Sequence, residues 1–181
     1  MLVPAITRKN EVEALFRNYL YTDEIIFYNG CIDNYEWTMK EEDGKYQFAI
    51  VNQKDNRVVG YVSYRVDFYA HQVCNFGLIC FNQSSKYKMT MAQGIKEIIK
   101  QVLYFNPRRI DFRYVSDNKA GIGYQKIVDF AAGAYEKNKI QLTGYMRDRA
   151  GNYRNLIIME LLKKDAWMMQ LADMTDSKSV F

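Results

Sequence analysis

The fold is decided by residues 73–125, which read VCNFGLICF (73–81), NQSSKYKMTMAQGIKEIIKQVLYFNP (82–107) and RRIDFRYVSDNKAGIGYQ (108–125). The first block is a short apolar run rich in aromatic and branched residues, which is typical of a strand. In the last block Ile110, Phe112 and Tyr114 alternate with charged residues, so we expect a second strand there.

Between these two strands the spacing predicts an amphipathic helix. Its apolar residues recur with helical periodicity, at Ile95, Ile98, Ile99, Val102 and Leu103. Asn106 and Pro107 end the helix, because proline cannot continue it and disfavours helical geometry in the residue before. Strand, helix and strand over this length predict a crossover between parallel strands. Ligands of such units favour the carboxyl ends of the strands and the N-terminus of the helix, so we expect the functional site there.

The residues before this stretch predict two further groups of elements. The first group is a short strand at 3–7, an amphipathic helix on apolar residues 12–20, and one or two short helices between 22 and 39. Asn10 and Glu13 are spaced as a capping pair for the first helix. The second group is two strands, at 48–51 and 58–68, joined by the turn QKDNR. With the strand at 73–81 they form an antiparallel meander.

The residues after the crossover predict a second helix over 122–134 and then a hairpin. The hairpin strands are expected at 140–146 and 153–162, on either side of RDRAGN. We therefore expect one α/β domain of the α+β type over 1–163, with a mixed sheet and helices on both faces. Residues 164–181 are a tail in which the spacing of Trp167, Met168, Leu171 and Met174 predicts a short amphipathic helix, packed on the body of the protein or on a partner. A homodimer is our hypothesis for the second case.

Composition limits the classes of function. The formal net charge is +4 with acidic and basic residues interspersed, which permits an anionic ligand without requiring nucleic acid. Arg108, Arg109 and Arg113 lie among aromatic residues, but they alternate with Asp111 and no RNA-binding motif is present, so nucleic acid is disfavoured. The N-terminus lacks a signal-peptide pattern and no apolar run is long enough to span a membrane, so we expect a cytoplasmic protein.

The chain has three cysteines without the spacing of a metal site, so we expect no metal. Cys74 and Cys80 lie an even number of residues apart on a predicted strand. They are therefore expected on one face, too far apart along the strand to form a disulfide. Reduced, buried thiols are the prediction.

Two segments carry a resemblance to a known family. Val115-Ser116-Asp117-Asn118-Lys119-Ala120, followed by a predicted helix, looks like a strand-end asparagine and the helix after it. The closing segment TGYMRDRAGNYRNLIIMELL (143–162) is similar to a terminal hairpin. With the order of elements, residues 5–163 resemble the GNAT superfamily of acyl-CoA-dependent N-acetyltransferases. The resemblance implies acetyl-CoA as co-substrate and a primary amine, on a small molecule or a peptide, as acceptor.

The resemblance also implies which residues bind the cofactor. The family's phosphate loop reads Gln/Arg-x-x-Gly-x-Gly/Ala, and its register here falls on residues 87–92, which keep only the final alanine. Amides of the central strand are expected to hold the thioester carbonyl. The implied cofactor-binding residues are Leu78, Ile79, Cys80, Lys88, Thr90, Met91, Ala92 and Asn118.

Catalysis is assigned to two residues. The family often has an aromatic hydroxyl seven residues after the asparagine, where this chain has Gln125, and Tyr124 one position earlier becomes the candidate acid. His71, the single histidine, is the candidate base because it titrates near neutrality. Asp67 and Glu36 are the other candidates for a base. Gly77 is expected to mark either a bulge where the backbone approaches the ligand or a packing position.

A second class of function remains open. The degenerate phosphate loop is also consistent with a GNAT-shaped protein that binds a ligand or partner without catalysis. Binding of acetyl-CoA and transfer of its acetyl group distinguish the two classes.

Overall fold

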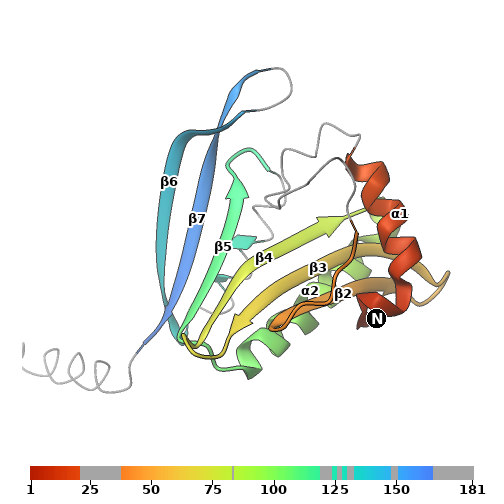
Figure 1. Ribbon diagram of the computed structural model, residues 1–181, viewed down its shortest axis with the longest axis horizontal. Coiled ribbons are helices and arrows are strands. Elements are labelled where there is room, and N and C mark those ends of the chain that lie inside the picture. The colour runs from red at the N-terminus through yellow and green to blue at the C-terminus, as the bar shows by residue number, and fades with distance from the viewer. Residues whose placement is uncertain are drawn as a thin grey trace, which may run out of the picture.

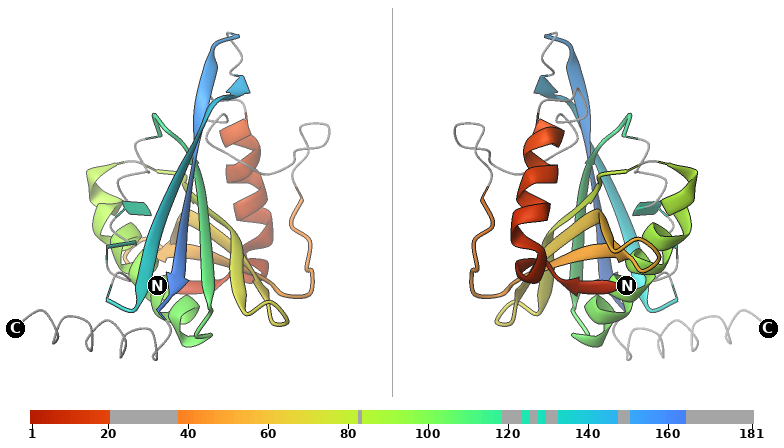
Figure 2. Two further views of the ribbon diagram at one scale, coloured as in Figure 1. Left: turned by 90° about the vertical axis from the view of Figure 1, so that its left-hand side faces the viewer. Right: turned by 90° about the vertical axis from the view of Figure 1, so that its right-hand side faces the viewer.

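The computed structural model describes residues 1–20, 38–82, 84–118, 124–125, 128–129, 133–147 and 151–164. Its elements are β1 (Leu2–Pro4), the 3₁₀ turn η1 (Ala5–Arg8), α1 (Lys9–Leu20), β2 (Lys45–Asn52), β3 (Arg57–Asp67), β4 (Gln72–Cys80), the 3₁₀ turn η3 (Ser85–Tyr87), α2 (Lys88–Tyr104), β5 (Arg109–Val115), β6 (Tyr135–Arg147) and β7 (Tyr153–Lys163). The strands form one sheet in the order β1-β2-β3-β4-β5-β7-β6. α1 and α2 cover opposite faces of this sheet (Figures 1 and 2).

The sheet has the predicted mixed topology. Strands β1 to β4 are antiparallel, β4 and β5 are parallel and joined by α2, and β7 pairs antiparallel with both β5 and β6. The meander, the crossover and the terminal hairpin are thus confirmed. β6 begins at Tyr135, earlier than predicted, where the buried tyrosine hydroxyl donates a 2.9 Å hydrogen bond to the Pro107 carbonyl.

The N-terminal prediction is confirmed for the helix and wrong for its cap. Asn10 lies inside α1, which continues directly from η1, so it does not cap a helix start. The Glu13 carboxylate accepts from the Met39 N–H, and the Glu11 carboxylate accepts from the Val58 N–H, each at 2.9 Å. These acidic residues therefore tie α1 to its neighbours. The short helices predicted between 22 and 39 lie almost wholly outside the described residues.

Two hydrophobic cores hold the helices on the sheet. The larger core, under α2, includes Ile50, Tyr64, Phe76, Ile98, Phe112 and Met159. The smaller core, under α1, includes Val12, Ala49, Val51 and Tyr61. α2 packs closely because Gly94 has no side chain, and a Cβ there would lie 2.8 Å from side-chain carbons of Ile50. No helix among the described residues is both long and apolar enough to cross a membrane.

A bulge interrupts β4. Arg65 of β3 pairs with Cys74 and Ser63 pairs with Gly77, so two β4 residues, Asn75 and Phe76, face one residue of β3. Asn75 has φ +52°, a conformation that asparagine adopts more readily than most residues. The bulge thus precedes Gly77, which pairs normally.

The bulge also overturns the prediction that the two strand cysteines share a face. The extra residue reverses the alternation, so Cys80 packs against the α2-side core whereas Cys74 faces the opposite side beside Arg65. Both cysteines are free thiols.

Candidate active site

The candidate site is an opening between two parallel strands. The β4–β5 ladder ends at the pair Phe76–Phe112. Beyond it β4 continues along β3 to Cys80, and β5 continues along β7 to Val115. The two carboxyl-terminal ends therefore diverge, as Figure 1 shows. A wedge bounded by unpaired strand edges can accept an extended ligand chain and offer it backbone hydrogen bonds.

Backbone amides of β4 face this opening. The Leu78 amide lies beside the hydroxyl of Tyr124, whose pKa it lowers in part. Amides alternate in direction along a strand, and the Phe81 N–H donates to Val59 of β3. Of the predicted cofactor-binding residues on β4, Leu78 and Cys80 thus direct their N–H groups toward the opening, and Ile79 directs its N–H toward β3.

Tyr124 closes the inner end of the opening. Its ring is stacked on Tyr114, with centroids 5.6 Å apart, and contacts the edges or faces of Phe76 and Phe112. The side chain is 3% exposed. Burial raises the pKa of Tyr124 above the ordinary tyrosine value, and the Leu78 amide lowers it in part. The phenol is therefore protonated at neutral pH and is able to donate a proton.

Gln125 takes no part in this cluster. Its side-chain amide donates to Asp129 at 2.8 Å on the exposed side of the segment. Of these two adjacent residues, Tyr124 is the one that lies in the aromatic cluster at the opening. The rest of the predicted helix at 122–134 lies mostly outside the described residues.

Asn118 lies at the end of β5, on the same edge of the sheet as the opening. Its N–H donates to the Val115 carbonyl at 2.9 Å and closes a turn. The next residue back, Asp117, is bound by Arg154 of β7 at 2.5 Å. These contacts fix the mouth of the opening on the β5 side.

The N-terminal end of α2 lies on the β4 side. η3 runs into the helix, because the Lys88 N–H donates to Ser85 and the Tyr87 N–H donates to Ser84. The Ser84 hydroxyl accepts from the Lys86 N–H, and Asn82 accepts from the Ser84 N–H. The positive end of the helical segment is therefore at residues 84–86, ahead of the predicted phosphate register.

The predicted phosphate-loop residues lie inside the first turns of α2. Lys88 and Ala92 are exposed and Thr90 is half-buried. Met91 is buried against Gly60, where a Cβ would lie 2.6 Å from the methionine sulfur. Methionine at this position thus packs the helix onto β3, and its side chain turns away from any ligand at the helix end.

An ion pair lies at the same helix end. Lys86 Nζ and the Tyr87 hydroxyl both bind Asp55 Oδ2 at 2.8 Å. The Lys86 ammonium also lies 5.0 Å from the centroid of the Tyr87 ring. Hydrogen bonds from Lys86 and Tyr87 lower the pKa of Asp55, which is therefore ionised at neutral pH. Sequence reasoning missed Asp55, because nothing local links the β2–β3 turn to this helix.

His71 and Asp67 lie at the opposite end of β4. Both belong to the β3–β4 turn, where Asp67 accepts from two turn amides and the His71 carbonyl accepts from the Arg108 N–H. Leu78 is about 20 Å further along the strand, at about 3.3 Å per residue. The structure thus does not bring the predicted base together with Tyr124. Glu36 lies outside the described residues.

The sheet face opposite α2 carries charges near the amino-terminal end of β5, away from the opening. Arg109 binds Asp111 at 2.9 Å and Glu160 at 2.7 Å, and Asp111 is buried. Burial and the nearby Asp111 raise the pKa of Cys74 on this face, so its thiol is protonated. Among the described residues no group of three histidine, cysteine or acidic side chains is placed to hold a metal ion.

Several solved structures have a similar architecture. An N-acetyltransferase from Staphylococcus aureus Mu50 superposes with a TM-score of 0.65 at 14% identity, over 91% of this chain and 98% of the other. A ribosomal-protein-S5-alanine acetyltransferase from Vibrio fischeri gives 0.61 at 17% identity, over 91% and 92%. A probable GNAT-family acetyltransferase from Chromobacterium violaceum gives 0.58 at 14% identity, over 90% and 85%. The chain has the GNAT fold. No protein-family model and no curated protein matches the sequence.

The GNAT fold confirms the architecture expected from the resemblance. At these identities it is the fold that is shared, so the roles of individual residues rest on the geometry of this chain. That geometry brings together Leu78, Cys80, Tyr124 and Asn118 around one opening, and adds Lys86 with its partner Asp55 at the helix end.

Proposed function

We propose that the protein is an N-acetyltransferase that transfers the acetyl group of acetyl-CoA to a primary amine by direct attack. The observation that carries this proposal is that the Tyr124 hydroxyl lies beside the Leu78 amide at the point where β4 and β5 separate. An amide that polarises a carbonyl and an acid that protonates a leaving group are the two groups this reaction needs.

In the proposed reaction the pantetheine arm lies in the opening along β4. The Leu78 N–H then binds the thioester oxygen, and the Cys80 N–H binds the arm further out. The amine nitrogen attacks the carbonyl carbon, the carbon–sulfur bond breaks, and the thiolate takes the Tyr124 proton. The amine releases its own proton to water. Asn118 would hold the arm from the β5 side.

The phosphates would lie at the positive end of α2. Amides of residues 84–86 and the ammonium groups of Lys86 and Lys88 supply the positive potential there, and a helix N-terminus favours anions. This placement leaves Met91 in its packing role. Thr90 and Ala92 follow in the first turns of the helix and would border the site.

The acceptor is proposed as a primary amine on a small molecule or a peptide. One structural neighbour named above, from Vibrio fischeri, and another from Brucella melitensis suggest the compounds to test, since both are named as ribosomal-protein alanine acetyltransferases. A peptide with an N-terminal alanine therefore belongs in the first panel, with a polyamine and a lysine peptide beside it.

Isothermal titration with acetyl-CoA, with free CoA as control, tests the proposal. We expect saturable binding in the micromolar range and release of free thiol with at least one amine of the panel. Asn118→Ala should weaken binding, and Tyr124→Phe should slow thiol release. No binding at millimolar acetyl-CoA would contradict the proposal.

One observation favours a second function, binding without catalysis. Tyr124 fills the inner end of the opening, and Asp55 holds Lys86 away from a ligand. A protein of this kind would bind CoA compounds and release no thiol with any amine. Thiol release that depends on the Tyr124 hydroxyl would exclude it.

A further inference from the structure

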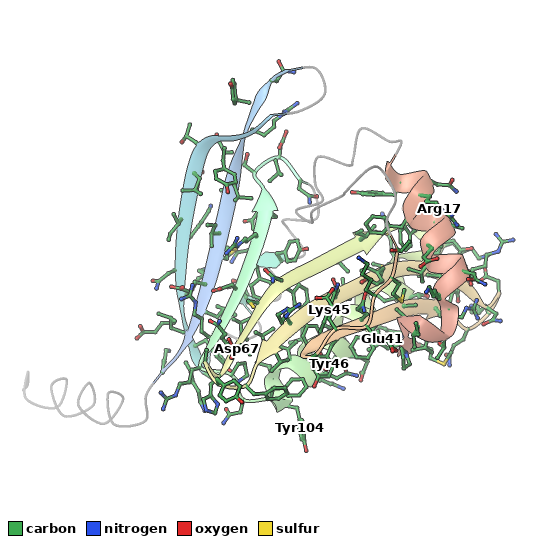
Figure 3. All side chains as sticks on the ribbon, in the orientation of Figure 1. Arg17, Glu41, Lys45, Tyr46, Asp67 and Tyr104 are labelled. Carbon is green, nitrogen blue, oxygen red and sulfur yellow. The ribbon has the colours of Figure 1, made fainter. Side chains whose placement is uncertain are left out.

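An aromatic patch is exposed at the end of the sheet far from the opening. It consists of Phe68 and Tyr69 in the β3–β4 turn and Tyr104 and Phe105 at the end of α2. Phe68, Tyr69 and Tyr104 are 58%, 101% and 88% exposed. The Phe68 and Phe105 rings meet edge to face at 6.2 Å, which joins the two parts of the patch. Figure 3 shows Tyr104 projecting from this end of the molecule.

Large aromatic side chains gathered in this way mark an interaction surface more often than single exposed residues do. The other exposed tyrosines among the described residues, Tyr145 and Tyr153, belong to the β6–β7 hairpin at the opposite end. These two tyrosines lie at the same end of the sheet as the opening. The aromatic patch lies at the other end and therefore has no part in the proposed reaction.

The C-terminal tail leaves the sheet beside this patch. The Lys163 N–H donates to the Arg108 carbonyl, and the Arg108 N–H donates to the His71 carbonyl in the turn that carries Tyr69. Lys163 Nζ also binds Asn106 at 2.6 Å, next to Phe105. Lys163 is thus hydrogen-bonded to the residues just after α2, and Arg108 links it to the β3–β4 turn.

The tail has the sequence of a complementary partner. Residues 165–181 read DAWMMQLADMTDSKSVF, in which Trp167, Leu171 and Met174 fall on one side of a helix. The segment carries three aspartates and one lysine, whereas exposed Arg108 and Lys163 border the patch. As a helix it would extend about 25 Å, at about 1.5 Å per residue, which is enough to cross the patch.

We propose that residues 165–181 dock on the aromatic patch of the same chain, with Trp167, Leu171 and Met174 against Phe68, Tyr69 and Tyr104. The tail is covalently tethered next to its docking surface, so its effective concentration there is high and weak contacts suffice. The attraction between its aspartates and the basic border adds a salt-dependent contribution.

Fluorescence of the full-length chain tests this docking. The sequence has two tryptophans, so Trp37→Phe leaves Trp167 as the only one. In that background we expect acrylamide to quench Trp167 weakly, because the indole is covered. Phe68→Ser with Tyr104→Ser should raise the quenching constant several-fold. Tyr145→Ser, which removes an exposed tyrosine on the hairpin, is the matched control and should leave the quenching constant unchanged.

Hydrogen exchange supplies a second measurement that needs no substitution in the patch. Ending the chain after Lys164 should raise amide exchange in residues 68–72 and 103–108 and leave the hairpin unchanged. Strong quenching of Trp167 in the parent would overturn the proposal, and so would burial of Trp167 that is insensitive to the patch substitutions. Quenching that rises on dilution would assign the patch to a second copy and would also overturn it.

Discussion

The phenol of Tyr124 lies beside the backbone N–H of Leu78 at the point where the β4–β5 ladder ends. Either group alone is unremarkable, because tyrosines pack on sheets and strand edges carry free amides. Together they place a proton donor beside a carbonyl-binding amide in a nearly dry environment. A ligand carbonyl that enters the opening replaces the phenol as the partner of the amide, which releases the phenol to act on the leaving group.

Tyr124→Phe removes the proposed acid and keeps the packing. We expect kcat to fall by about a hundredfold, within the usual range for general acid catalysis, with an unchanged Kd for acetyl-CoA. Steady-state kinetics and titration calorimetry measure the two quantities. Tyr114→Phe, on the ring stacked against Tyr124, is the control and should keep kcat near the parent value. Equal rates for Tyr124→Phe and the parent would remove the acid role.

The pH profile checks the same assignment. Burial raises the pKa of Tyr124 above its ordinary value of 10.0, so the phenol stays protonated throughout the neutral range and somewhat beyond pH 10. The rate should therefore show no decline from this group as pH rises from neutrality to about 10. The assignment would be contradicted if kcat of the parent fell between neutrality and about pH 10 and this decline were absent in Tyr124→Phe.

Asp55→Asn and Lys86→Gln should change cofactor affinity in opposite directions. The first removes a negative charge from the helix end and frees the Lys86 ammonium, so acetyl-CoA should bind a few-fold more tightly. The second removes a positive charge and should weaken binding by a similar factor. Calorimetry at two salt concentrations checks both, since the difference should shrink as salt rises. Weaker binding in both variants would mean that the ion pair acts by holding η3 against the β2–β3 turn.

Tyr64→Phe should stabilise the protein. The Tyr64 hydroxyl is buried in the larger core and has no hydrogen-bond partner among the described residues, so its removal should raise the free energy of unfolding by about 1 kcal/mol. Burial also raises the pKa of Tyr64. The unfolded chain therefore loses this proton first, and the contribution of Tyr64 is present below about pH 10 and lost as pH rises above it.

Urea unfolding of Tyr64→Phe at neutral and alkaline pH measures both effects. The variant should lose less stability than the parent between about pH 9 and 11. Phe48→Leu, which alters a ring stacked on Tyr64 without touching a hydroxyl, is the control and should leave the pH dependence unchanged. A variant less stable than the parent at neutral pH would reveal a hydrogen bond to the Tyr64 hydroxyl in solution.

Gly94→Ala should destabilise the protein although alanine favours helices. Helix propensity gains about 1 kcal/mol, but the new Cβ would lie 2.8 Å from Ile50 and must push α2 from the sheet, at about 1–3 kcal/mol. Thermal or urea unfolding gives the difference. Ile50→Ala removes all three side-chain carbons that the Cβ would meet, so in that background Gly94→Ala should cost less stability than it does in the parent. A more stable Gly94→Ala would show that the helix moves at little cost.

The predictable part of this structure is what neighbouring residues encode. The alternation of Phe112 and the helical spacing of Ile98 were enough to predict the crossover, because one buried face per element sets the pattern. The ring of Tyr124 was placed near the opening only through the family resemblance. In the structure Tyr124 lies in the aromatic cluster, whereas the Gln125 side chain binds Asp129.

The unpredictable part depends on residues far apart in the chain. The bulge at Asn75 depends on how β4 pairs with β3 and β5 at the same time. The sequence VCNFG alone does not predict which residue adopts the positive φ. Asp55 and Lys86 are joined by a side-chain contact between a turn and a helix end. His71 has the side chain of a candidate base, but it lies before β4, at the end of the sheet opposite the opening.

The rings of Tyr46, Tyr64, Phe76, Tyr124 and Tyr114 form an unbroken row across the α2 side of the sheet, each ring in contact with the next. Such a row has an optical consequence, since phenol rings held in fixed, asymmetric contact give near-ultraviolet circular dichroism. A ligand that displaces Tyr124 would break its contacts with Tyr114 and Phe76 and leave the stacks from Tyr46 to Phe76 in place. The protein thus contains its own spectroscopic reporter of the opening, readable without a label and without turnover.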